Sequence, residues 1–109
     1  MTRKQALAKL IEKVDAGDAT NDGSMFRAFG DKWTICFDAF HGSLDAALAL
    51  HEAVLHERVV AEIKYCVRYE PIVRLWDLAS NISETTADTP ARAWLLAIIK
   101  ALHAEEADQ

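Results

Sequence analysis

Hydrophobic residues near the start of the chain recur at the spacing of an amphipathic helix. The positions i, i+3, i+4 and i+7 are occupied by Leu7, Leu10, Ile11 and Val14. Such a repeat places its members on one face of a helix. Thr2 and Gln5 precede it in the arrangement of a capping box, and Gly17 stands where a helix commonly ends. The sequence therefore predicts an N-terminal helix.

The following segments combine short apolar patterns with turn residues. The letters MFRAFG, which end at Gly30, indicate a short helix, whereas residues 33–38, WTICFD, alternate as a strand does. Ser43 then stands in position to cap another helix. Asp45 lies in the first turn of that helix, where the positive end of the helix dipole favours a carboxylate. We expect this helix to reach at least Leu50.

The longest alternating pattern lies between Val59 and Tyr69, where apolar residues occupy the odd positions. Strict alternation predicts a strand with one covered face. Residues 72–78, IVRLWDL, supply a second strand, so we expect a β-hairpin with Pro71 at the entrance of its second strand. Residues 79–88, ASNISETTAD, are expected to form a polar loop.

The last helix is predicted to begin with Thr89 as its N-cap and Pro90 at its first position, which is the preferred order. Its interior, AWLLAIIKAL, is apolar on nearly every side, so other elements should cover more than one side of it. Residues 105–109, EEADQ, read as a frayed acidic tail. The pattern as a whole predicts one α+β domain over residues 1–109, with a small antiparallel β-sheet layered between helices.

Composition narrows the classes of function. The chain has 109 residues, of which 51% are hydrophobic, as expected for one globular domain. Its net charge of −5 argues against a broad nucleic-acid or membrane surface, because binding to phosphates needs clustered Lys and Arg. No apolar signal segment follows Met1, and Cys36 and Cys66 lie far apart without a C-x-x-C spacing. We therefore expect a reduced, cytoplasmic protein, with a long-range disulfide between Cys36 and Cys66 as the alternative.

The stretch HEAVLHE, residues 51–57, is close to the zinc-binding H-E-x-x-H motif, but its histidines, His51 and His56, are five residues apart. Histidines four apart on a helix lie about 40° from each other and can meet one ion. Histidines five apart diverge by about 140°. The spacing therefore argues against a zinc hydrolase. His51 lies instead on the apolar stripe of its helix, which predicts a partly buried ring with hydrogen-bonded nitrogens.

Other catalytic motifs are not found in the sequence. None of the four glycines belongs to a phosphate-binding loop, and no G-x-S-x-G elbow is present. We expect no catalytic residue, cofactor or metal. The alternative is a small enzyme or metal-binding protein whose site is assembled in space from His41, His51, His103 or Cys36.

Two segments carry a family resemblance. Residues 40–50, FHGSLDAALAL, contain an aromatic-x-x-S-L-D-A-A-L pattern, and residues 86–104 contain a T-P-A-x-A segment that opens a helix. With a hairpin between them, they resemble the phage ABA sandwich domain, a family of small phage and prophage proteins. The resemblance spans about residues 40–104, although HEAVLHE stands where that family has a turn such as V-P-E-G. It implies an α/β/α layered fold and a phage or prophage origin, and it brings no catalytic residues.

The leading hypothesis for function is a non-enzymatic accessory protein of the phage type that acts by binding another protein. That class includes inhibitors of host defence systems. The spatial His and Cys site described above is the second hypothesis. The third is nucleic-acid binding through Lys and Arg gathered on one face, which the net charge disfavours.

Self-association is predicted from the last helix. Its stripe of Trp94, Leu95, Ile98 and Leu102 suffices to cover one sheet, and Leu96 and Ile99 point away from that stripe. We expect Leu96 and Ile99 to meet a second copy of the chain in a homodimer. In the alternative, residues 20–39 fold over these two side chains.

Overall fold

The computed structural model describes residues 2–17, 23–55, 59–66, 68–77 and 81–107. Within them, helices and strands follow one another as α1 (Arg3–Asp15), α2 (Ser24–Phe29), the short 3-10 helix η1 (Gly30–Lys32), α3 (Trp33–Phe40), α4 (Leu44–Val54), β1 (Val60–Cys66), β2 (Tyr69–Trp76), β3 (Asn81–Thr86) and α5 (Pro90–Ala107). The three strands form one antiparallel sheet in the order β1-β2-β3.

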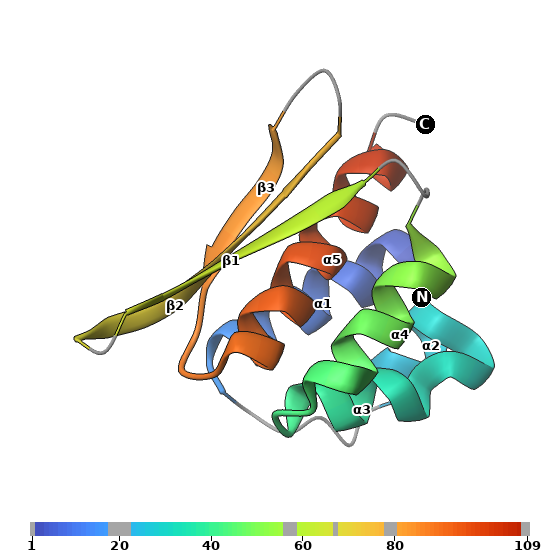
Figure 1. Ribbon diagram of the computed structural model, residues 1–109. Helices are drawn as coiled ribbons and strands as arrows, with labels where there is room; N and C mark the ends of the chain where they lie inside the picture. The colour runs from blue at the N-terminus through green and yellow to red at the C-terminus, as the bar shows by residue number, and fades with distance from the viewer. Residues whose placement is uncertain (1, 18–22, 56–58, 67, 78–80, 108–109) are drawn as a thin grey trace.

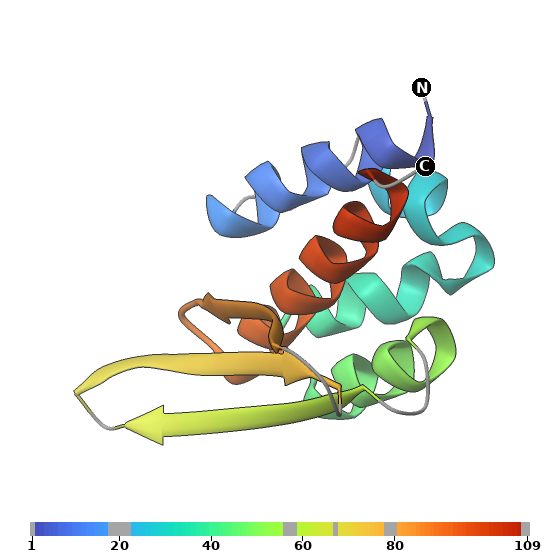
Figure 2. The same ribbon diagram turned by 90° about the horizontal axis from the view of Figure 1, so that it is seen from above.

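The sheet and the helices are arranged in layers with α5 at the centre (Figures 1 and 2). Helix α5 packs on the sheet, and α1, α3 and α4 pack against α5. The α+β class and the small antiparallel sheet are therefore confirmed. The order of the layers differs from the expectation, because α5 lies between the sheet and α1, and no described helix lies over the opposite face of the sheet (Figure 2). That face carries charged side chains, including Arg74 and Glu84, which form an ion pair at 2.9 Å, and beside them the exposed apolar side chains of Val60 and Trp76.

The central place of α5 explains its composition. From Ala91 to Leu102, all residues except Arg92 and Lys100 are buried. A helix surrounded by a sheet and three other helices has no solvent face along most of its length, so it needs no polar stripe. Burial of each large aliphatic side chain contributes about 1.5–3 kcal/mol, and α5 supplies more buried side chains to the described core than any other element.

Three predicted helix caps are confirmed. Thr2 and Gln5 form a reciprocal capping box at α1, with Gln5 N donating to Thr2 Oγ1 at 3.2 Å and Thr2 N donating to Gln5 Oε1 at 2.9 Å. At α4, Ala46 N donates to Ser43 Oγ at 3.1 Å. At α5, Arg92 N donates to Thr89 Oγ1 at 3.1 Å. Each contact satisfies a backbone N–H group that has no partner inside its helix.

The β1–β2 hairpin is also confirmed, but its first strand ends at Cys66 and Tyr69, predicted to end that strand, begins the second. The register explains the position of Pro71. Lys64 pairs with Ile72 and Cys66 pairs with Tyr69, so two residues of β2 stand opposite the single residue between Lys64 and Cys66. Pro71 is one of those two, and it is therefore in a bulge, inside β2 and not at its entrance. A bulge tolerates proline because one residue of the ladder is left unpaired there.

Two secondary-structure predictions were wrong. Residues 33–38 lie in helix α3, where Cys36, Ala39 and Phe40 are buried. Trp33, Cys36, Phe37 and Phe40 also fit the helical spacing i, i+3, i+4 and i+7, so alternation over six residues does not identify a strand. The predicted polar loop contains strand β3, which has Ile82 as its one apolar residue. Its Ser and Thr residues suit a strand, but they leave no hydrophobic pattern.

Candidate functional site

His51 connects α4 to α5 and to the residue that precedes β1. Trp94 Nε1 donates to His51 Nδ1 at 3.2 Å, and His51 Nε2 lies 3.0 Å from the carbonyl oxygen of Val59. Because an indole nitrogen only donates, Nδ1 accepts, and the proton of the neutral ring is therefore on Nε2, where it bonds to Val59. The ring is 9% exposed. The predicted buried, hydrogen-bonded histidine is thus found, and its Nδ1 lone pair is already used.

The other two candidate histidines lie in different surroundings. His41 is exposed at the end of α3, where its ring packs on Phe37 at 4.4 Å and on Phe40 at 5.3 Å between centroids. His103 is half-buried in the C-terminal part of α5. The described residues contain no group of three or more His, Cys, Asp or Glu side chains that could hold a metal ion.

Cys36 is a free thiol buried in the helical core. Burial raises its pKa to about 12, because the core does not solvate a thiolate. The thiolate is the nucleophilic form of cysteine, so this side chain packs as a small apolar residue near neutral pH.

Leu96 and Ile99, the predicted dimer interface, are buried inside the chain. Leu96 is 1% exposed and Ile99 is 0% exposed. The prediction that they face a second copy is therefore wrong. Residue spacing on α5 correctly showed that its apolar surface exceeds what the sheet can cover. The helices α1, α3 and α4, which pack against α5, supply the additional cover.

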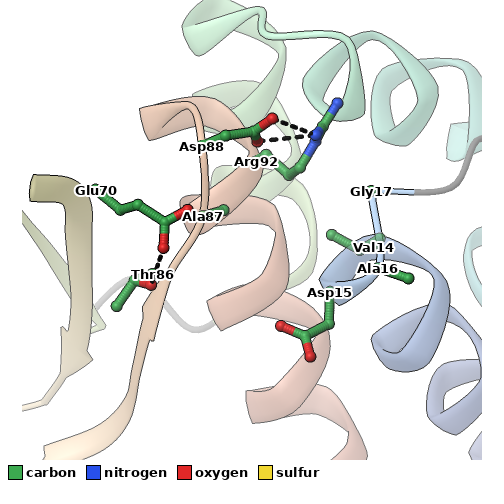
Figure 3. Close-up of a pocket in the computed structure, with 9 residues that line it drawn as sticks. All are labelled: Val14, Asp15, Ala16, Gly17, Glu70, Thr86, Ala87, Asp88 and Arg92. Atoms are coloured by element: carbon green, nitrogen blue, oxygen red, sulfur yellow. Dashed lines mark hydrogen bonds and ion pairs between the residues drawn. The ribbon is translucent and has the colours of Figure 1, made fainter.

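A pocket of about 270 Å³ opens between the C-terminal end of α1 and the segment that connects β3 to α5 (Figure 3). Its polar lining includes three carboxylates and one guanidinium, namely Asp15, Glu70, Asp88 and Arg92. Figure 3 shows the Arg92 head group against Asp88 and the Glu70 carboxylate against Thr86.

Arg92 connects the segments that line one side of this pocket. Its Nη1 donates to both carboxylate oxygens of Asp88 at 2.8 and 2.9 Å, while Nε and Nη2 donate to the carbonyl oxygen of Phe40 at 3.2 and 3.1 Å. The guanidinium carbon also lies 4.4 Å from the centroid of the Phe40 ring. These contacts join the end of α3 to the start of α5. Since its donors are used in this way, we assign Arg92 a structural role.

The tip of the β1–β2 hairpin is the most exposed apolar feature of the sheet. The hairpin extends beyond the helices (Figures 1 and 2). Near its end, Ile63 is 39% exposed, Tyr65 is 73% exposed and Tyr69 is 75% exposed. We call these three residues the hairpin tip. Alternation in the sequence predicted a covered face for these residues. It indicates which side chains share a face, but it does not indicate how far along the strand the helices cover that face.

No family model, curated protein or solved structure matches this chain. Among the described residues, no helix has both the length and the apolar character that crossing a membrane requires.

Proposed function

We propose that this protein is a non-enzymatic binding module that recognises another protein through the hairpin tip. The observation that carries the proposal is the exposure of Ile63, Tyr65 and Tyr69 near the end of a projecting hairpin, where the pairing of Tyr69 with Cys66 puts its ring on the face opposite to Tyr65, so that a partner enclosing the end of the hairpin reaches both rings. Tyrosine is enriched in protein interfaces, since its ring buries a large apolar area while its hydroxyl keeps a hydrogen bond. A partner that covers two such rings gains area at little conformational cost.

The contacts of the candidate catalytic residues favour a binding function over a catalytic one. Both ring nitrogens of His51 are engaged, the Cys36 thiol is buried, and Arg92 is committed to Asp88 and Phe40. These side chains have structural roles that account for their positions. Tyr65 and Tyr69, by contrast, are 73% and 75% exposed, so packing within the described residues does not account for their positions.

We further propose that the module belongs to the accessory proteins of phages and prophages, a class that includes inhibitors of host defence systems, and that it acts in the cytoplasm. The phage-type assignment rests on the resemblance of residues 40–50 and 86–104 to the phage ABA sandwich domain. The free, buried Cys36 is compatible with a reducing compartment.

We also propose that the protein forms a homodimer. Leu96 and Ile99 of α5 are buried within the chain and do not form its interface. The support comes instead from the sheet, which has β1 at one edge and exposed apolar side chains on that strand, including Val60. An exposed strand edge of this kind favours association between chains.

The binding proposal is tested by affinity purification from the source organism with two matched baits. One bait carries Tyr65→Ser and Tyr69→Ser, and the other carries Phe26→Ser, which removes an exposed aromatic ring from α2, far from the hairpin. We expect a protein that the natural chain and the Phe26 variant retain and that the tyrosine variant loses at least about tenfold, as truncation of aromatic hot spots does. Equal retention by the tyrosine variant would contradict the proposal.

A further inference from the structure

The two edges of the sheet are not equally protected. The inner side chains of β3 are fixed to α5, since Ser83 Oγ donates to the carbonyl oxygen of Ala97 at 3.0 Å and Thr85 Oγ1 donates to that of Ala93. Strand β1 packs on α5 less extensively than β2 and β3 do. Within the described residues, β1 has no strand neighbour on the side away from β2, so alternate N–H and C=O groups face outward along that edge.

Two side chains of opposite charge lie at equal distances along β1 on either side of Ile63. Glu62 and Lys64 flank Ile63 and lie on the same face of the strand, because their partners on β2 are Arg74 and Ile72, two residues apart. Both charged side chains are accessible, at 39% and 59% exposure, and their charged groups are 3.8 Å apart. An antiparallel copy of this three-residue segment therefore presents Lys64 opposite Glu62 and Glu62 opposite Lys64.

We propose that β1 pairs with β1 of a second copy, antiparallel and about a two-fold axis at Ile63, to form one six-stranded sheet. In this register, each Glu62 lies opposite Lys64 of the other copy, on both sides of the axis. A register centred on Glu62 would place two glutamates opposite each other, and one centred on Lys64 would place two lysines opposite each other. Like charges in directly opposed positions are destabilising, so of these three registers the charges favour the one centred on Ile63, which also sets two pairs of opposite charge against each other.

Apolar contacts favour the same arrangement. The two Ile63 side chains meet at the axis, and Tyr65 of each copy lies opposite Ala61 of the other. In the single chain, Ile63 is 39% exposed and Tyr65 is 73% exposed, so strand pairing adds cross-strand contacts to both side chains, while the face of the sheet on which they lie stays open to the proposed protein partner. An isologous contact of this kind closes after two copies, as a two-fold dimer requires.

This inference rests on the proposed homodimer and assigns its interface. The test uses sedimentation equilibrium of the full chain at tens of micromolar, followed by exchange of charges on β1. Glu62→Lys alone makes all four opposed charges positive, and Lys64→Glu alone makes all four negative. We expect each single variant to raise the dimer dissociation constant by at least about tenfold.

Mixing the two single variants is the decisive step. In a mixed dimer, every opposed pair again has opposite charges, so we expect the mixture to form a heterodimer about as readily as the natural chain forms its homodimer. Native mass spectrometry distinguishes the heterodimer, because the two variants differ in mass. Glu52→Lys, on the exposed surface of α4, makes the same charge change as the first variant away from the strand and should leave dimerisation unchanged.

The possible outcomes separate the two claims. A natural chain that sediments at 12.1 kDa throughout would overturn both the proposed homodimer and this interface. A mass of twice that value, unaffected by the single variants, would leave the homodimer in place and overturn the β1 interface. Loss of dimers in the single variants without recovery in the mixture would also overturn the register.

Discussion

The two edge strands of the sheet, β1 and β3, are attached to the molecule in opposite ways. Strand β1 has the apolar alternation of a conventional strand, yet the side chains toward its end are exposed. Strand β3 is mostly polar, yet Thr85 is buried, and both Thr85 and Ser83 donate to carbonyl oxygens of α5. Hydrophobic pattern alone therefore does not indicate which strand is held more firmly.

The difference lies in the surface that each strand meets. Strand β3 contacts the part of α5 that contains Ala93 and Ala97, whose small side chains allow a close approach between strand and helix. At that distance, hydroxyl groups reach the helix carbonyls, and they satisfy their own hydrogen bonds in doing so. Strand β1 is fixed mainly at its start, where His51 bonds to the carbonyl of Val59, and its far end projects.

The largest effect is expected from the attachment of β1. His51→Ala removes the bond to Val59, leaves the Trp94 N–H without its partner and opens a cavity between α4 and α5. The free energy of unfolding should fall by about 2–4 kcal/mol in urea titrations. His41→Ala removes an exposed ring and is the control, with an expected loss below about 1 kcal/mol.

The close approach of β3 to α5 is tested by a larger side chain. Ala97→Leu inserts three carbon atoms at a fully buried position next to Ser83, so β3 must move away from the helix. Overpacking of this kind typically costs about 1–3 kcal/mol. The same substitution at Ala53, which is exposed on α4, should have little effect on thermal unfolding. Equal tolerance at both positions would contradict the tight contact between β3 and α5.

The hydroxyl contacts of β3 should contribute less than its packing. Thr85→Val keeps the shape of a buried side chain and removes its bond to the carbonyl of Ala93. We expect a loss of about 1 kcal/mol in denaturant titrations. Thr86→Val, at the exposed neighbouring position, removes only a 3.3 Å bond to Glu70 and should cost a few tenths of a kcal/mol or less. A larger loss at Thr86 would contradict the assigned faces of β3.

The smallest effect on stability is expected at the hairpin tip. Tyr65→Ser should change the free energy of unfolding by no more than about 0.5 kcal/mol, because the ring is 73% exposed. Calorimetric melting of this variant beside the natural chain measures the difference. A loss comparable to that of His51→Ala would mean that Tyr65 packs within the chain, and it would remove the main support for the proposed binding surface.

The sequence was informative where a single local interaction determines the structure. The Thr2–Gln5 box, the Ser43 cap and the Thr89 cap each depend on two or three neighbouring residues, and all three occur as predicted. The hairpin was likewise predicted from alternation. Residues 33–38 were assigned incorrectly because short apolar runs fit two periods, and strand β3 was missed because its stability comes from a distant helix.

The candidate binding surface was less predictable than the fold. Alternation placed Ile63 and Tyr65 on a covered face, and nothing local to the strand shows where the cover ends. Conversely, the apolar surplus of α5 suggested a partner for Leu96 and Ile99, but α1, α3 and α4 pack against that helix within the same chain. Exposure depends on the arrangement of whole elements, so a surface is inferred from sequence less reliably than a helix cap.

Residue-resolved hydrogen exchange in dilute solution tests most directly the claim that β3 is anchored and that the end of β1 is free. Exchange reports the free energy of local opening, and a strand fixed to α5 should open less readily than a projecting one. We expect the amides of β3 that bond to β2 to exchange at least about tenfold more slowly than those amides between Ile63 and Tyr65 that bond to β2, a difference of about 1.4 kcal/mol or more in the free energy of opening. Equal protection of the two strands, or faster exchange in β3, would contradict that claim.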